Sequence, residues 1–185
     1  MDKREAIMQA AVDLFAERGF YGTPVPLIAA KANVGAGTIY RYFKDKDHLV
    51  NELYRHWKSE LFQAIERDLA TDMPLRALFG EIGRRWIGFA MNNRSAYTFL
   101  VSHHHAPYLD EETVKMTETM HLKYMEIFEL GRKEQIFKDV KPEVLLAVVS
   151  GIIDQIMKEF WSGRFDLTPE MLAMIDEICW QAVRR

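Results

Sequence analysis

Residues 33–49 read NVGAGTIYRYFKDKDHL, and they predict one short helix, Ala36–Phe43, that is apolar on a single side. Ile39 and Phe43 are four residues apart, so they share a helical face and are expected to point into the core. Gly37 leaves the backbone bare near the start of this helix, where free N–H groups and the helix dipole attract anions. A helix of this shape fits the major groove of DNA.

A second short helix is predicted before this one, at Leu27–Ala32, with the turn Asn33-Val34-Gly35 between them. Thr23 followed by Pro24 is typical of a helix N-cap with proline at the first helical position. Two short helices joined by a tight turn form a helix-turn-helix whose second helix reads DNA. The alternative is that the tyrosines of residues 40–43 serve packing or a protein partner, as in a helical adaptor.

Composition favours a globular chain with one local basic surface. The 185 residues are 49% apolar and 28% charged, with net charge −3. Between residues 31 and 46, Lys31, Arg41, Lys44 and Lys46 outnumber the single acid Asp45. Such a patch suits contact with a phosphate backbone at one surface, although an ordinary solvent-exposed face would have the same charge composition.

The remaining composition excludes several classes. One cysteine, Cys179, rules out an internal disulfide framework and a cysteine-based zinc finger. No apolar run approaches the roughly 18 residues of a membrane span. The charged, amphipathic first residues lack the apolar stretch of a secretory signal, so we expect a cytoplasmic protein.

Helical periodicity continues along the chain and predicts an all-α fold of about nine helices. The first helix should end at Gly19, and the fourth should run from Asp45 or Lys46 to about Ala70. Asparagine pairs and prolines separate the others. These later helices are expected at residues 75–92, 95–104, 110–133, 142–162 and 168–184.

The N-terminal quarter resembles the TetR family of bacterial transcriptional regulators. The elements that carry the resemblance are Ile7, Ala10-Ala11, Leu14-Phe15, Glu17, Gly19-Phe20, Thr23, Val25, Ile28-Ala29, Ala32, Val34, Gly37-Thr38-Ile39-Tyr40, Tyr42-Phe43, Lys46 and Leu49. The resemblance implies a helix-turn-helix DNA-binding domain at residues 1–48 and a helical effector-binding and dimerisation domain at residues 49–185.

The same resemblance implies DNA-contact residues. Its phosphate contacts would be Thr23, Tyr40, Tyr42 and Lys46, and the residues nearest the base edges would be Gly37, Thr38 and Arg41. The sequence departs from the family at Gly35 and Ala36, where a serine and then a polar or basic residue are common. The loss of these side chains leaves either close approach of the backbone or apolar contact with a thymine methyl, so the operator sequence does not follow from the chain.

A dimer is expected because a two-fold DNA site needs two reader helices about 34 Å apart. The helix at 142–162 is apolar over more than one face, which favours an interface beside the core, unless the helix is fully internal. The family's usual four-helix dimer bundle supports the interface. The expected interface residues are Ile152, Ile156, Phe160, Leu172, Ile175 and Cys179.

The middle helices are expected to hold a small apolar or aromatic effector, because aromatic bulk mixed with polar tips lines small-molecule sites. Plain core packing is the alternative for each of these residues. The candidates are Trp86, Phe89, Phe99, His103, His121, Tyr124, Phe128 and Gln155.

These features predict a homodimeric repressor that a small molecule releases from a near-palindromic operator in double-stranded DNA, with the long fourth helix carrying the displacement. The alternative is a helical small-molecule-binding protein or adaptor without DNA binding. We expect no enzyme, since no phosphate loop or nucleophile motif occurs. No cofactor is expected either. No metal is expected, because three consecutive histidines, residues 103–105, cannot all face one ion from a helix.

Overall fold

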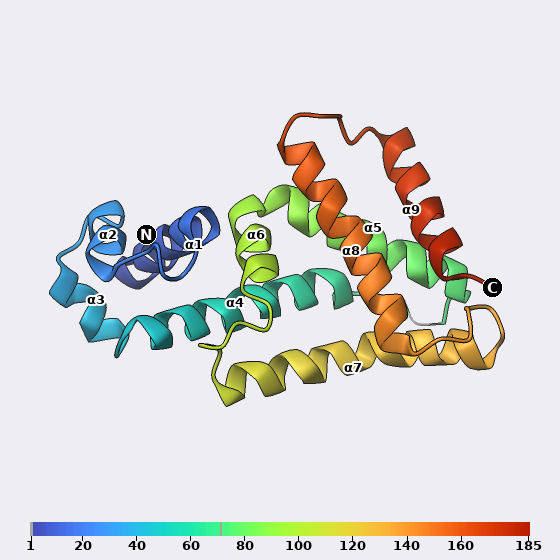
Figure 1. Ribbon diagram of the computed structural model, residues 1–185, viewed down its shortest axis with the longest axis horizontal. Coiled ribbons are helices and arrows are strands. Elements are labelled where there is room, and N and C mark those ends of the chain that lie inside the picture. Colours follow the sequence, from blue (N-terminus) through green and yellow to red (C-terminus); the bar gives the residue numbers. More distant parts are fainter. Residues whose placement is uncertain (1, 71) are drawn as a thin grey trace. The chain divides into compact units, whose positions relative to one another are not determined.

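The computed structural model describes residues 2–70 and 72–185, and it is all-α (Figure 1). Within the described residues nine helices follow one another, and no strand is present beyond an isolated bridge between Phe137 and Arg184. The all-α prediction is confirmed. The helices are α1 Lys3–Arg18, α2 Val25–Lys31, α3 Ala36–Tyr42, α4 Lys46–Glu66, α5 Leu75–Asn92, α6 Arg94–Ser102, α7 Glu111–Lys133, α8 Pro142–Trp161 and α9 Pro169–Val183.

Two predicted helix ends are wrong, and the backbone explains both. The second helix begins at Val25, two residues before the predicted start at Leu27, and Pro24 is its N-cap residue. The early start is possible because Pro26 falls in the first turn, where its missing N–H is tolerated. The fourth helix ends at Glu66 rather than near Ala70, and Asp68 two residues later has a positive φ of 52° that no α-helix can contain. Gly19 does end α1, with φ 67°.

The chain divides into two compact units, each with its own core. The first comprises the described residues up to Leu61 together with Asn93–Thr117, and the second comprises Phe62–Asn92 and Glu118–Arg185. The predicted boundary after residue 48 lies inside α4. Both α4 and α7 are continuous helices that contribute residues to the two units.

The first unit is built around the α1 helix. Its apolar stripe ends in Phe15, which is fully buried with its ring stacked against those of Phe20 and Phe99 at 6.0 Å. Contacts between α1 and α6, between α1 and α2, and between α2 and α3 close this core. Ile28 and Ile39, one from each short helix, are also fully buried, so the helix-turn-helix is fixed to α1 by its apolar side.

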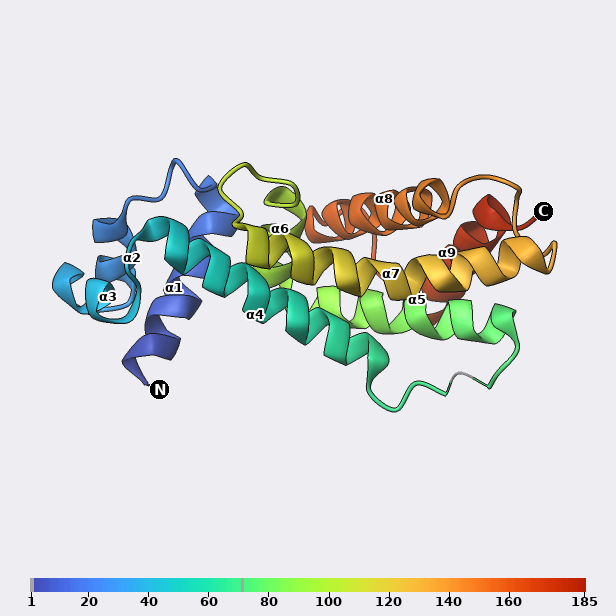
Figure 2. The same ribbon diagram turned by 90° about the horizontal axis from the view of Figure 1, so that it is seen from below.

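The second unit packs α9 against α5 and α8 (Figures 1 and 2). An aromatic cluster of Phe79, Phe128, Phe137 and Trp180 fills one end, with ring centroids 5.4–6.4 Å apart. Gly131 is required there, because a Cβ at this position would collide with the Phe137 ring. Within the described ranges, no helix is long and apolar enough to cross a bilayer.

Candidate functional site

The α3 helix has one buried and one open side. Gly35 is its N-cap residue, with extended backbone, and the Thr38 N–H donates to the Gly35 carbonyl at 2.8 Å. Ile39 and Phe43 are 1% exposed, as predicted, although Phe43 is the C-cap residue rather than the last helical one. The buried pair holds α3 to the unit, so the opposite side is left to solvent.

The open side carries the residues predicted to read DNA. Tyr40 is 55% exposed and Tyr42 is 40% exposed, and Gly37 and Arg41 are exposed as well. Thr38 is half-buried. Phenol hydroxyls and a guanidinium on one short exposed helix can donate hydrogen bonds to phosphate oxygens or base edges.

The charges around α3 divide into open and engaged groups. No ion pair involves Arg41 or Lys44 in the part of the chain that the structure describes. Lys46 is engaged: its Nζ donates to the Phe20 carbonyl at 3.0 Å and lies 4.0 Å from the centre of the Phe20 ring. Lys31 pairs with Asp13 at 3.3 Å. Arg41 and Lys44 are therefore the cations most available to a ligand on this surface.

Thr23 requires a correction. Its hydroxyl donates to the Gly19 carbonyl at 2.8 Å and to the Leu14 carbonyl at 3.2 Å, and the residue is fully buried. It makes no capping hydrogen bond to α2, whose N-cap residue is Pro24. The side chain joins the end of α1 to the following turn and offers nothing to a phosphate.

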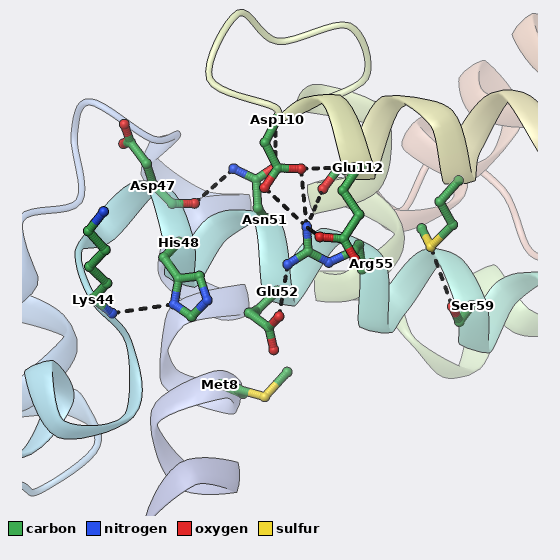
Figure 3. A network of polar contacts seen from close by, with 12 residues as sticks. Met8, Lys44, Asp47, His48, Asn51, Glu52, Arg55, Ser59, Asp110 and Glu112 are labelled. Carbon is green, nitrogen blue, oxygen red and sulfur yellow. Dashed lines mark hydrogen bonds and ion pairs between the residues drawn. The ribbon is translucent and has the colours of Figure 1, made fainter.

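A polar network fixes α4 to the start of α7 within the first unit (Figure 3). Asn51 is 2% exposed, and its amide donates to the carbonyls of Asp47 and Tyr108, both at 2.8 Å. Its side-chain oxygen accepts from the Asp110 N–H, also at 2.8 Å. One buried side chain thus satisfies two backbone groups of the α6–α7 loop.

Arg55, one turn further along α4, extends this network. Its guanidinium bonds Glu52 at 2.8 Å and Asp110 at 3.1 Å, and Glu52 also pairs with Arg4 of α1 at 2.9 Å. The hydrogen bond from Arg55 lowers the pKa of Glu52. Burial alone would raise the pKa of Asp110, but hydrogen bonds from Thr113 and Arg55 outweigh it and lower the pKa. Both carboxylates therefore remain charged at neutral pH.

The second unit contains a cavity of about 630 Å³. Its wall is largely apolar, with side chains from four helices. The helices α5 and α7 contribute Phe79, Ile82, Trp86, Ile87, Tyr124 and Phe128, among others. The helices α8 and α9 contribute Leu146, Val149, Ile153, Leu172, Ile175 and Cys179. This volume and lining are typical of small-molecule sites.

The predicted effector residues divide between this cavity and other places. Trp86, Tyr124 and Phe128 line it. Phe99 and His103 do not, because they lie in the core of the first unit, where the His103 Nδ1 is 2.9 Å from the Phe99 carbonyl. Burial lowers the pKa of His103, which keeps it neutral in that core.

The other three predicted effector residues are also absent from the cavity wall. Phe89 is buried but does not line the cavity. His121 does not line the cavity, and Gln155 is exposed with its amide bound to Glu159 at 2.7 Å. Aromatic or polar character alone does not distinguish a cavity wall from other surroundings.

The predicted dimer residues need a similar correction. Ile175 and Cys179 are buried inside the unit and line the cavity, and the half-buried Leu172 lines it too. Ile152, Ile156 and Phe160 are half-buried on α8. The open apolar face of these two helices is formed instead by Val144, Val148, Met174 and Ile178, each at least 40% exposed.

Residues 103–105 form no metal site. His103 points into the core, and the His104 Nδ1 is 3.3 Å from the Tyr54 hydroxyl. Burial, His105 and Lys58 together lower the pKa of His104 to about 4. No group of three or more potential ligands that could hold a metal ion occurs in residues 2–70 and 72–185.

Sequence reasoning missed several cavity residues. They include Gly80, Gly83 and Gly88 of α5 and the aliphatic side chains Ile82, Ile87 and Met91. In the sequence, the aliphatic side chains look like ordinary core residues. The glycines carried a usable signal, because three glycines within one predicted amphipathic helix are unfavourable unless packing or a ligand needs the space.

Comparisons with known proteins agree with this architecture. Residues 7–53 match a family model described as bacterial regulatory proteins of the tetR family, and residues 54–185 match one described as the tetracyclin repressor-like C-terminal domain. A TetR family transcription regulator from Marinobacter aquaeolei has the same fold, with a TM-score of 0.87 and 21% identity over 98% of this chain and 95% of that one.

Two further matches are a curated relative and a solved structure. The HTH-type transcriptional repressor Rv3405c of Mycobacterium tuberculosis is 41% identical over 40% of this chain and 39% of its own length. This chain spans less than half the length of the first curated relatives it matches. The crystal structure of AibR with isovaleryl coenzyme A and operator DNA matches with a TM-score of 0.77 and 21% identity, covering 96% of each chain.

Proposed function

This chain belongs to the TetR family of bacterial transcriptional regulators, and from that premise we propose that it is a homodimeric repressor released from its operator by a small apolar effector. The single observation that carries the proposal is the open side of α3, where Tyr40, Arg41 and Tyr42 project from a helix anchored by buried Ile39. The relative from Mycobacterium tuberculosis is named a repressor, which supports the direction of regulation.

We place the DNA contacts on α3 and its flanks. Tyr40, Tyr42 and Lys46 would bind phosphates, with Lys46 exchanging its bond to the Phe20 carbonyl for a stronger one to an anion. Gly37, Thr38 and Arg41 would lie nearest the base edges. Residues 1–48 form the DNA-binding domain in this proposal, and residues 49–185 form the effector-binding and dimerisation domain.

The open apolar face of α8 and α9 is the proposed dimer interface. Val144 and Val148 are one turn apart on α8, and so are Met174 and Ile178 on α9. Four large apolar side chains exposed on two packed helices form a patch that a second copy of the chain would cover. Ile152, Ile156 and Phe160 extend this face along α8 with their half-exposed edges.

The cavity of the second unit is the proposed effector site. The AibR structure contains both an acyl coenzyme A and operator DNA, so a regulator of this fold can hold both kinds of ligand. Here Tyr124 and Phe128 of α7 line the cavity, and the opposite end of α7 is held to α4 by Asn51 and Arg55. An effector that displaces α7 would therefore act on α4, which directly follows the reader helix.

We propose a regulatory and not a catalytic role. The only cysteine lines the cavity, but burial and then Asp176 raise the pKa of its thiol to about 11, so a reactive thiolate is absent at neutral pH. The alternative is a helical small-molecule-binding protein without DNA binding. It would share the cavity but would have no use for the exposed tyrosines and arginine of α3.

A salt titration with Tyr42→Ala tests the DNA contacts. Wild-type affinity for a fragment of its own upstream region should fall steeply with salt, because each neutralised phosphate releases counterions. Tyr42→Ala should weaken binding about 5- to 13-fold on all sequences, as expected for loss of about 1–1.5 kcal/mol in a phosphate contact. Fluorescence anisotropy with labelled duplexes measures both.

The matched control is Tyr21→Ala, because Tyr21 is 81% exposed but lies outside α3. We expect its affinity to match the wild-type value within about twofold. Unchanged affinity in Tyr42→Ala, or salt-independent binding by the wild type, would contradict the proposed DNA interface and favour the small-molecule-binding alternative.

A further inference from the structure

Three glycines of α5 line the cavity, and they do so for different reasons. A Cβ on Gly80 would lie 3.0 Å from the Asp176 Oδ1 and 3.1 Å from a terminal nitrogen of Arg76. Gly80 therefore makes room for the ion pair between these two side chains. Its absence of a side chain is explained by packing inside the protein.

Gly83 and Gly88 have no such explanation. A Cβ at either position would meet no neighbouring atom within 4 Å, so alanine would fit both without strain. Neither glycine has a positive φ, so the backbone conformation does not require it. Glycine weakens a helix interior relative to alanine, so these two positions lower the stability of α5 with no gain within the chain. What they provide is open space along the cavity wall.

The charged groups at the cavity are already paired. Arg84 is bound to Glu81, and Asp176 accepts from Arg76 at 2.5 and 3.2 Å. The Cys179 thiol is neutral. A charged group that entered the cavity would lose its hydration and gain no free counter-charge, which is strongly unfavourable.

Tyr124 supplies a separate sign that a ligand completes this site. The residue lines the cavity and is 9% exposed, and its buried hydroxyl has no hydrogen-bond partner among the residues described. Burial raises the pKa of this hydroxyl, so it stays protonated and able to donate. A buried donor without a partner is costly, and its acceptor must then come from outside the chain.

We propose that Gly83 and Gly88 are ligand-contact positions, and that the cavity takes an uncharged, largely apolar molecule whose body lies against the bare backbone of α5. This inference rests on the proposed effector role of the cavity and specifies the chemical class of its ligand. The two glycines keep the wall open, and the paired charges at its edge discriminate against ionic molecules.

Two fluorescent probes with one skeleton test the charge preference. N-phenyl-1-naphthylamine is uncharged at neutral pH, and 8-anilino-1-naphthalenesulfonate adds one sulfonate to the same skeleton. We expect the full-length protein to bind the uncharged probe at least 10-fold more tightly, measured by fluorescence titration. Equal or tighter binding of the sulfonate, or no binding of the uncharged probe, would overturn the inference.

Substitutions test the glycines. Gly83→Leu and Gly88→Leu should each weaken binding of N-phenyl-1-naphthylamine at least 10-fold, because their side chains occupy the ligand's space. Gly83→Ala should raise or preserve the melting temperature, and it should weaken binding of N-phenyl-1-naphthylamine less than Gly83→Leu does. This opposite movement of stability and binding separates a ligand-contact position from a structural one.

Gly151 provides the matched control. It is also helical, and a Cβ there meets nothing within 4 Å, but it lies on α8 and does not line the cavity. Gly151→Leu should therefore leave probe affinity within twofold of the wild-type value. Wild-type probe affinity in both Gly83→Leu and Gly88→Leu would overturn the inference. DNA binding is measured separately, so loss of the proposed DNA function and failure of this ligand assignment give distinguishable results.

Discussion

Replacing Asn51 with leucine is expected to lower the free energy of unfolding by about 2–4 kcal/mol. The leucine has a similar volume but leaves the Tyr108 carbonyl and the Asp110 N–H without the partner that Asn51 gives each of them at 2.8 Å. Asn51 is 2% exposed, so water does not readily replace it. Each buried backbone group left unpaired costs about 1–3 kcal/mol.

Urea unfolding followed by circular dichroism measures this loss as a shift of the midpoint. Asn92→Leu is the matched control, because Asn92 is exposed and its amide binds the Gly88 carbonyl of its own helix. We expect Asn92→Leu to lower the free energy of unfolding by less than about 0.5 kcal/mol. Equal stability of the two variants would show that the bond from α4 to the α6–α7 loop does not stabilise the first unit.

The second large effect is expected from placing charge on the open face of α8 and α9. Val148 is 40% exposed and Ile178 is 52% exposed, and neither lines the cavity. The double variant Val148→Asp, Ile178→Asp should therefore fold as a monomer, while a dimer would have to bury four carboxylates of like charge around its two-fold axis. We expect the variant to be monomeric at micromolar concentration.

Loss of the dimer should weaken operator binding at least 100-fold, because the second reader no longer binds at the high effective concentration that linkage to the first provides. Analytical ultracentrifugation and anisotropy titration measure the two consequences on one sample. Leu122→Asp with Leu130→Asp is the control, since these two exposed residues lie on α7. A double variant at positions 148 and 178 that remains dimeric would contradict the proposed interface.

The helix-turn-helix could be predicted because its determinants are local. Ile39 and Phe43 lie four residues apart, and both are buried as that spacing requires. Thr23 could not be placed correctly from sequence, because threonine before proline reads as a cap. Its hydroxyl instead binds two carbonyls at the end of α1, and this pairing depends on how the chain turns back.

The cavity was harder to predict because its wall is defined by tertiary packing. Phe99 and Phe128 look alike in sequence, yet the first packs against Phe15 in one unit and the second lines the cavity of the other. Likewise, Ile175 and Ile178 of α9 look alike in sequence. Only the fold shows that Ile175 faces inward while Ile178, three residues later, faces solvent.

The most direct test of the central claim, that α3 reads DNA as half of a symmetric pair, is a footprint on the upstream region of the gene itself. We predict protection of one near-palindromic site whose half-sites are centred about 34 Å apart. In Arg41→Ala, protection of both half-sites should be lost together. Protection of a single unpaired half-site, or wild-type protection by Arg41→Ala and Tyr42→Ala alike, would contradict the claim.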